Sequence, residues 1–170
     1  MLRYLTPLLL LAACADPQPR LDFDSAAASV CTIARVTDGD TVVCEDGERV
    51  RLLLIDTPEM DQGEFGTLAR LELLKITPPG ARVRMEFDVE REDRYGRTLA
   101  YLYTADGRFV NEEMARSGYA LVLSYPPNVK HIDRIREATE EARAEGAGLW
   151  GMQAFDCPPV DHRAGRCDGG

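Results

Sequence analysis

Short runs of apolar residues separated by tight-turn signals dominate the chain after residue 30. The runs at 41–44 and 50–55 are rich in β-branched and aliphatic side chains. An Asp-Gly pair precedes each of them, at 38–39 and 46–47, and Asp-Gly between such runs is a strong signal for a tight turn between strands. We therefore predict three consecutive strands in a meander, the last of them occupying 50–55.

The apolar period changes further along the chain. Apolar spacing over 64–76 suits a helix, which Pro-Pro-Gly at 78–80 would end. Strict alternation over 83–89 predicts a half-buried strand, and 98–103 predicts another, which turns at Asp-Gly 106–107.

The remaining part of the chain reads as mainly helical. Asn111 is expected to cap a short helix that Gly118 ends, residues 119–123 form a brief strand, and apolar residues from Ile132 mark one face of a helix ending near Gly146. The element order is β-β-β-α-β-β-α-α. It predicts an α+β fold, an OB-fold barrel of five strands with about three packed helices.

The N-terminal segment differs from the rest and has the features of an export signal. Arg3 precedes a short apolar run that is too short to span a bilayer, and the run ends in Leu-Ala-Ala-Cys. This resembles a bacterial lipobox, so we expect a signal peptide at 1–13, lipidation of Cys14, and a tether over 14–29. The protein would then be exported and anchored by lipid to the bacterial cell envelope. Ordinary signal cleavage at the A-x-A sequence 13–15 is the alternative.

Length and charge limit the possible functions. The 170 residues suffice for one domain with a sizeable core. A formal net charge of −9 counts against a broad basic surface for DNA, although a small cationic cleft on an acidic body remains compatible with it. All basic residues except Lys75 and Lys130 are arginines, which bind phosphate through paired hydrogen bonds. No protein partner can be inferred.

Four cysteines follow the N-terminal segment, and export would place them in an oxidising compartment. They allow three pairings. Cys157 and Cys167 lie ten positions apart in a Pro- and Gly-rich tail, and Cys31 and Cys44 flank the first hairpin, so we predict these two disulfides. A zinc site is the weaker alternative, because there is no C-x-x-C and His162 is the sole nearby imidazole.

Two groups of carboxylates stand at predicted strand ends. Asp38 and Asp40 lie in the first turn, and Asp56 and Glu59 follow the apolar run 52–55. Two carboxylates plus a carbonyl, with positions left for water and phosphate, suit a hard cation such as Ca²⁺. The alternative is that the first pair serves as turn formers alone.

Arginines accompany both groups. Arg51 directly precedes the second apolar run, and Arg97 shares a turn with Arg94 and Tyr95. Such residues are usually solvated surface side chains. Beside a metal site, however, guanidinium groups and a carboxylate would supply what phosphodiester cleavage requires.

These segments together resemble the staphylococcal nuclease (thermonuclease) family, over about residues 36–150. The motifs occur in the same order as in that family: VTDGDT at 36–41, VRLLLIDTPE at 50–59, DRYGR and LAY at 93–101, VNE at 110–112, and GLW at 148–150. The resemblance implies an OB-fold nuclease domain over 30–155, followed by a cysteine-containing tail at 156–170. It also implies Ca²⁺-dependent hydrolysis of DNA and RNA, its nucleic acid substrates, to 3′-phosphorylated products.

The resemblance also assigns a role to the acidic motifs, residue by residue. Asp40 and Asp56 match the calcium carboxylates, and Thr57 matches the residue that gives its backbone carbonyl. Glu59 matches the carboxylate that orients or deprotonates the attacking water.

The cationic and aromatic positions follow in the same way. Arg51 and Arg97 match the two arginines on the scissile phosphate, and Arg94 and Tyr95 match positions beside the bound nucleotide. The family's pair of pocket tyrosines is reduced here to one, so Tyr125 is the candidate for base stacking.

Two other functions compete with a nuclease: a non-catalytic OB-fold module that binds nucleic acid or another ligand, and a structural envelope lipoprotein. Catalytically inactive relatives would lack an acidic or arginine position, and here all of them are present, which favours the enzyme. Cleavage of nucleic acid on addition of Ca²⁺ discriminates between these functions.

Overall fold

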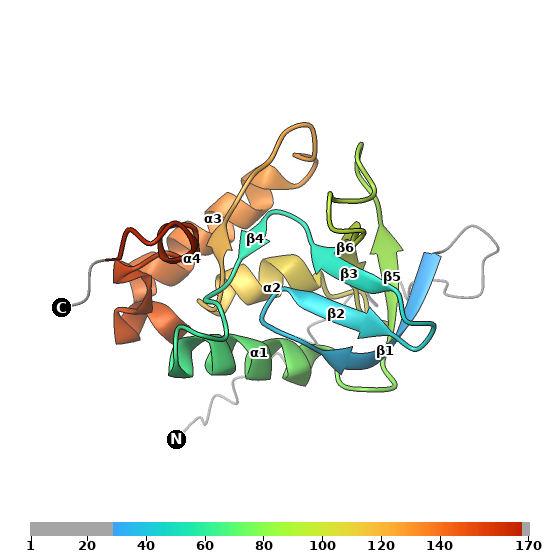
Figure 1. Cartoon of the computed structure of the whole chain (residues 1–170), viewed down its shortest axis with the longest axis horizontal. Helices are drawn as coiled ribbons and strands as arrows, with labels where there is room; N and C mark the ends of the chain where they lie inside the picture. Colours follow the sequence, from blue (N-terminus) through green and yellow to red (C-terminus); the bar gives the residue numbers. More distant parts are fainter. Residues whose placement is uncertain (1–28, 168–170) are drawn as a thin grey trace, which may run out of the picture.

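Five strands close into a β-barrel, as the sequence predicts (Figure 1). The computed structural model describes residues 29–167, and the predicted lipidation site at Cys14 lies outside them. Around the barrel the strand order is β1-β2-β3-β6-β5. The strands are β1 (Ser29–Val36), β2 (Thr41–Cys44), β3 (Arg49–Leu52), β5 (Arg82–Glu86) and β6 (Thr98–Tyr103).

The barrel closes through pairings between strands that are distant in sequence. The predicted meander β1–β2–β3 is antiparallel throughout. Strand β6 then pairs in parallel with β3, Val50 opposite Thr98, and antiparallel with β5. Strand β5 returns to β1, with Ser29 opposite Met85. Side chains that point inward, such as Ile33, form a core fully removed from solvent.

The single strand predicted over 50–55 is two strands. Strand β3 ends at Leu52, and β4 (Ile55–Asp56) belongs to a separate two-stranded sheet with β7 (Leu121–Val122). Between them Leu54 adopts a left-handed φ of 63°, which redirects the chain although its side chain stays buried. The redirection carries Asp56 away from the barrel wall to its rim.

The strand predicted over 83–89 is also shorter than its alternation suggests. It ends at Glu86, and Val89 is 69% exposed. Residues 87–97 instead form the connection to β6. The alternation of apolar residues in the sequence therefore extends beyond the hydrogen bonds that β5 makes with its neighbouring strands.

The three substantial helices that the sequence predicts are α1 (Glu64–Ile76), α2 (Val110–Arg116) and α3 (Ile132–Glu145). Helices α1 and α2 pack on barrel strands, and α3 packs mainly on α2 and β7. Helix α3 ends at Gly146, whose left-handed φ of 62° suits glycine. None of the helices within residues 29–167 has the length and apolar character needed to cross a membrane.

Asn111 does not cap α2, contrary to the sequence prediction. Phe109 precedes the helix, and the Asn111 side chain is fully buried inside its first turn. Its Nδ2 donates to the Leu53 carbonyl at 2.8 Å, and its Oδ1 accepts from the Leu102 N–H at 3.0 Å. Asn111 therefore joins α2 to β6 and to the turn between β3 and β4.

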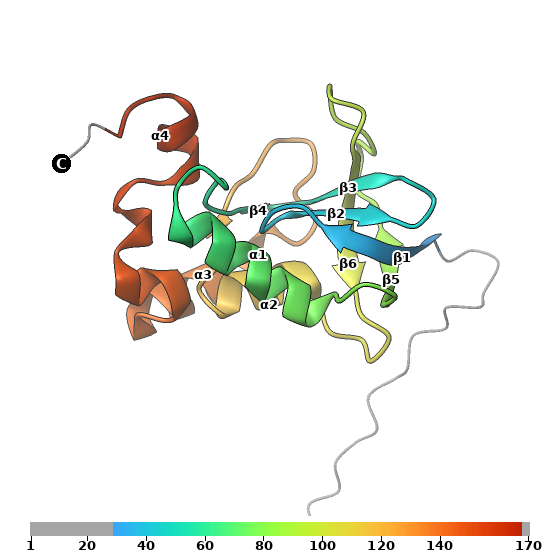
Figure 2. The same cartoon turned by 60° about the horizontal axis from the view of Figure 1, so that its bottom comes forward.

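The C-terminal part lies at the opposite end of the molecule from the barrel (Figures 1 and 2). It contains the 3₁₀ turns η1 (Gly148–Met152) and η2 (Ala154–Asp156) and the short helix α4 (Pro159–Arg163). Both predicted disulfides are formed, Cys31–Cys44 and Cys157–Cys167, with Cα–Cα distances of 5.4 and 5.6 Å. These pairings exclude a zinc site built from the same cysteines.

Candidate active site

The two acidic motifs meet at the rim where β2 begins and β4 ends. The backbone N–H and the hydroxyl of Thr57 each donate to Asp40 Oδ2 at 3.3 Å. Asp40, Asp56 and Thr57 are all buried, with Asp56 only 2% exposed. Gly39 permits this approach, because a Cβ there would lie 2.6 Å from Thr57 Oγ1. The predicted metal-ligating residues are thus neighbours in space.

Arg51 reaches this acidic group from strand β3. Its Nη2 lies 3.0 Å from Asp40 Oδ2 and 3.5 Å from Asp56 Oδ1, and its side chain is only 14% exposed. A guanidinium therefore faces both predicted metal carboxylates. Arg51 is held here by the register of β3 beside β2, which pairs it with Thr41.

Asp38, which the sequence places in the first carboxylate group but not among the predicted metal ligands, adds a third carboxyl group. Its Oδ1 accepts from the Asp40 N–H at 3.1 Å. Burial raises the pKa of Asp38 to about 6, and the negative charge of Asp40 adds to the rise. Burial also raises the pKa of Asp56, although hydrogen bonds from Arg163 oppose this. The site therefore holds more negative charge than its buried environment favours.

The donor chemistry of this site fits a hard divalent cation. Asp40 and Asp56 offer carboxylate oxygens, Thr57 is predicted to add its backbone carbonyl, and a divalent ion would offset the accumulated negative charge. Soft ligands do not contribute, because the cysteines of the described residues are all in disulfides. Ca²⁺ suits such an all-oxygen set.

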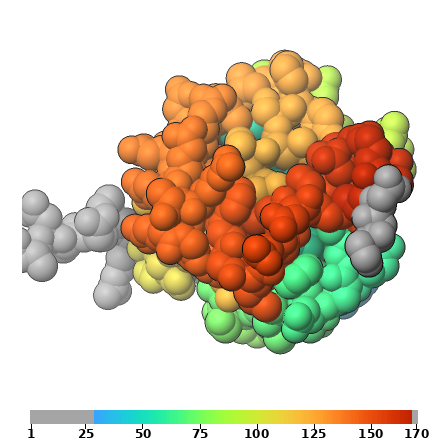
Figure 3. Space-filling model, turned by 90° about the vertical axis from the view of Figure 1, so that its left-hand side faces the viewer, coloured from blue at the N-terminus to red at the C-terminus, as the bar shows by residue number. Residues whose placement is uncertain are grey.

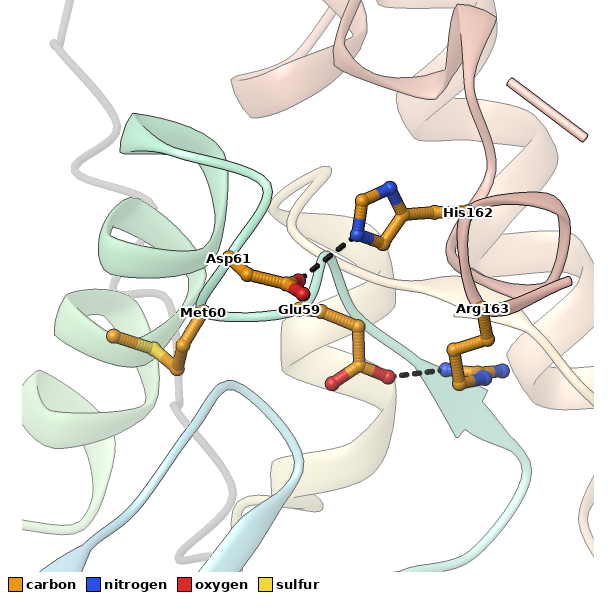
Figure 4. Close-up of a pocket in the computed structure, with 5 residues that line it drawn as sticks. All are labelled: Glu59, Met60, Asp61, His162 and Arg163. Carbon is orange, nitrogen blue, oxygen red and sulfur yellow. Dashed lines mark hydrogen bonds and ion pairs between the residues drawn. The ribbon is translucent and has the colours of Figure 1, made fainter. Parts of the chain in front are cut away.

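Glu59 lies beside the acidic group, at the edge of solvent. Its side chain is 38% exposed, and its backbone N–H donates to Gln62 Oε1 at 2.8 Å. A cavity of about 490 Å³ opens here, and Figure 4 shows the side chains that line it: Glu59, Met60, Asp61, His162 and Arg163. Glu59 thus has access to water, whereas Asp56 is enclosed.

The tail brings an arginine into this site that the sequence does not reveal. Arg163 Nη1 lies 2.6 Å from Glu59 Oε1, and its Nη2 lies 2.8 Å from Asp56 Oδ2. No local pattern points to this contact, because Arg163 is 107 positions from Asp56 in an arginine-containing tail.

Arg97 lies in the connection between β5 and β6. It forms an ion pair with Asp93 at 2.7 Å, and Asp93 Oδ1 also accepts the N–H groups of Tyr95 and Arg97. Within residues 29–167 its ion pair is with Asp93 and not with the acidic group around Asp40. Arg94 stacks over the ring of Tyr95, which is 63% exposed. The predicted nucleotide-binding pair is therefore accessible on a turn.

Tyr125, the predicted stacking residue, is 67% exposed in the connection between β7 and α3. Its backbone bridges to Asn128, and among the described residues no contact links it to the acidic group. The structure therefore brings together a subset of the predicted site residues: Asp40, Arg51, Asp56, Thr57 and Glu59.

Comparison with known proteins places this geometry in context. A family profile described as "Staphylococcal nuclease homologue" matches residues 49–152. The chain is 40% identical over 126 residues to a thermonuclease of Staphylococcus intermedius, covering 69% of this chain and 74% of that protein. It is 36% identical over 137 residues to endonuclease YncB of Bacillus subtilis, covering 73% of this chain and 63% of that protein. A prophage-derived endonuclease of the same bacterium is equally similar over 73% of this chain, which spans only 45% of that longer protein.

Proposed function

Because the chain belongs to the staphylococcal nuclease family, we propose that it is a Ca²⁺-dependent nuclease that hydrolyses DNA or RNA to 3′-phosphorylated products. The observation that carries the proposal is the buried Asp40–Arg51–Asp56 group beside the accessible carboxylate of Glu59. A binding module has no need for an acidic group that is enclosed, charged and next to a water-accessible carboxylate.

Each residue then has a defined task. Asp40, Asp56 and the carbonyl of Thr57 would hold the ion, which when bound supplies Lewis-acid polarisation of a phosphate oxygen. Glu59 would orient a water molecule and accept its proton as the water attacks phosphorus. Arg51 would donate to the phosphate oxygens from the barrel side, where developing negative charge strengthens the interaction.

Arg97 would approach the phosphate from the β5–β6 connection. Its guanidinium is held by Asp93, so a phosphate must replace or share this partner. The Arg97 side chain is 23% exposed, so a phosphate can reach it and replace Asp93 as its partner. Arg94 and Tyr95 lie on the same turn and would contact the adjoining nucleotide.

Incubation of the purified protein with single-stranded DNA tests the proposal. Cleavage with 3′-phosphate ends should appear with Ca²⁺, disappear with chelator, and be lost in Asp40→Ala. Binding of DNA without cleavage under all of these conditions would instead support the non-catalytic OB-fold module. An absence of both binding and cleavage would favour a structural role.

We also propose that the protein is a lipoprotein anchored to the cell envelope through Cys14, because Leu-Ala-Ala precedes this cysteine. Mass spectrometry of the mature N-terminus should find an acylated Cys14. An unmodified N-terminus at Asp16 would show that ordinary signal cleavage takes place.

A further inference from the structure

Arg163 satisfies both oxygens of the most enclosed carboxylate in the site. Its Nη1 donates to Asp56 Oδ1 at 3.0 Å and its Nη2 donates to Asp56 Oδ2 at 2.8 Å. The same Nη1 reaches Glu59 Oε1 at 2.6 Å. One guanidinium thus engages both a predicted metal ligand and the predicted water-activating carboxylate.

The segment that carries Arg163 is held against the site from several directions. The Cys157–Cys167 disulfide closes residues 157–167, which we call the tail loop, and helix α4 lies within it. At its start, Gln62 Nε2 donates to the Cys157 carbonyl at 3.1 Å. Beside Arg163, His162 Nε2 lies 2.9 Å from Asp61 Oδ1 (Figure 4). Figure 3 shows the tail loop lying on the surface next to the segment between β4 and α1.

A guanidinium and a metal ion cannot use these oxygens independently. Both oxygens of Asp56 accept hydrogen bonds from Arg163, and Arg51 lies near Oδ1 as well, so a metal ion at these oxygens would have to share them with or displace a guanidinium. Guanidinium carries a permanent positive charge and offers no lone pair to a metal.

We propose that Arg163 is a tethered cation that competes with the divalent metal for Asp56 and also occupies Glu59, so that metal binding requires the tail loop to release Asp56. The proposal rests on the proposed function, since it assumes a metal at Asp40 and Asp56. Arg163 differs from Arg51 and Arg97 in that one guanidinium engages both oxygens of Asp56 and also Glu59, so we assign it to these carboxylates and not to phosphate. The apparent metal affinity equals the intrinsic affinity multiplied by the fraction of molecules in which Arg163 has released Asp56.

Isothermal titration calorimetry with Ca²⁺ tests the competition. Arg163→Ala should lower the dissociation constant for Ca²⁺ by about threefold or more relative to the wild type. Arg166→Ala is the matched control, because it removes the same charge from the same tail loop and its ion pair is with Asp161. Its dissociation constant should equal that of the wild type.

The tether is tested separately. Cys157→Ser with Cys167→Ser opens the tail loop and keeps Arg163, so it should also tighten Ca²⁺ binding, though less than Arg163→Ala does. In the wild type, Ca²⁺ should accelerate amide hydrogen exchange over residues 159–166, since release of Arg163 loosens the tail loop. A structural support would show unchanged or slower exchange.

Equal or weaker Ca²⁺ binding in Arg163→Ala than in the wild type overturns the competition, even if the protein proves to be a Ca²⁺-dependent nuclease. A wild type that neither binds Ca²⁺ nor cleaves DNA overturns the proposed function, and the competition with it. The two failures are distinguishable, because only the second abolishes the binding heat of the wild type.

Discussion

Substitutions at Arg97 and Glu59, which lie on different loops, test the proposed chemistry at single residues. Arg97→Ala and Glu59→Gln should each lower kcat by at least about a hundredfold, or ~2.7 kcal/mol, because each removes an interaction that strengthens in the transition state. Ca²⁺ affinity should change little in Arg97→Ala and fall in Asp40→Ala, which removes a proposed metal ligand. Steady-state kinetics across a Ca²⁺ titration measure both effects.

Arg136→Ala is a suitable control, because Arg136 forms a surface ion pair with Asp133 on helix α3. Its kinetics should match those of the wild type. Normal turnover in Arg97→Ala would show that the Asp93 ion pair serves only to shape the turn.

Glu86, which lies away from the site, should make the stability of the fold depend on pH. Burial alone would raise its pKa, but hydrogen bonds from Lys130, His131 and Tyr103 outweigh burial and lower the pKa to about 2, from an ordinary 4.5. A lowered folded-state pKa stabilises the fold above pH 4.5, and this stabilisation is lost as the pH falls from 4.5 towards 2.

Glu86→Gln should therefore reduce the free energy of unfolding by about 1 kcal/mol at pH 7, a value discounted for solvent screening of a partly exposed group. The difference from the wild type should shrink as the pH approaches 2. Urea unfolding at several pH values measures it, with the exposed Glu137→Gln as control. A difference that is constant with pH would contradict the ion-pair origin.

Local motifs reveal some site residues and conceal others. The sequence points to Asp40 and Asp56 as carboxylates beside predicted strands, and the family resemblance adds Thr57. Arg163 cannot be identified in this way, because its role depends on the path of a tail that brings it back to Asp56 across 107 positions. Asp38 is visible as a turn residue, but its raised pKa comes from burial, which the turn motif does not encode.

At the scale of elements, the approach of the 38–41 and 56–59 loops depends on Gly39. A Cβ at this position would lie 2.6 Å from Thr57 Oγ1 and 2.7 Å from the Ala69 Cβ on α1. Gly39→Ala should therefore force the loops apart and lower the free energy of unfolding by about 1–3 kcal/mol. It should also weaken Ca²⁺ binding, because Asp40 and Asp56 separate.

Urea unfolding and calorimetry measure these two effects of Gly39→Ala. If both quantities stayed at their wild-type values, the contact between the loops would be loose enough to accommodate a methyl group.

Elements whose position is determined by nearby residues in the sequence match the prediction closely. The helical period and the prolines that follow it place α1 at Glu64–Ile76. The sequence does not reveal the break after Leu52, because the four consecutive buried aliphatic residues at 52–55 have no periodicity that marks the end of a strand. Its cause is tertiary: the Leu53 N–H donates to the Ala100 carbonyl, and its carbonyl accepts from Asn111.

For the whole molecule, the Cys31–Cys44 disulfide joins β1 to β2, and its cysteines are 13 positions apart in the sequence. Replacing both cysteines with alanine should lower the free energy of unfolding by about 2–4 kcal/mol, since the unfolded chain gains freedom and two buried sulfur atoms are lost. Denaturant unfolding without reductant measures the change. Removing Cys157–Cys167 should affect global stability less, because the tail loop lies outside the barrel core.

The order of strands around the barrel also affects the rate at which the protein folds. Strand β6 comes last of the five in the chain but lies between β3 and β5. The barrel closes only when β5 pairs with β1, the first strand of the chain. Ser29 opposite Met85 and Val50 opposite Thr98 are distant pairs, so the chain must lose loop entropy before these contacts can form. We expect refolding on a timescale of roughly milliseconds to seconds, which stopped-flow fluorescence of Trp150 can follow. Refolding within microseconds would mean that local helices, and not closure of the barrel, limit the rate.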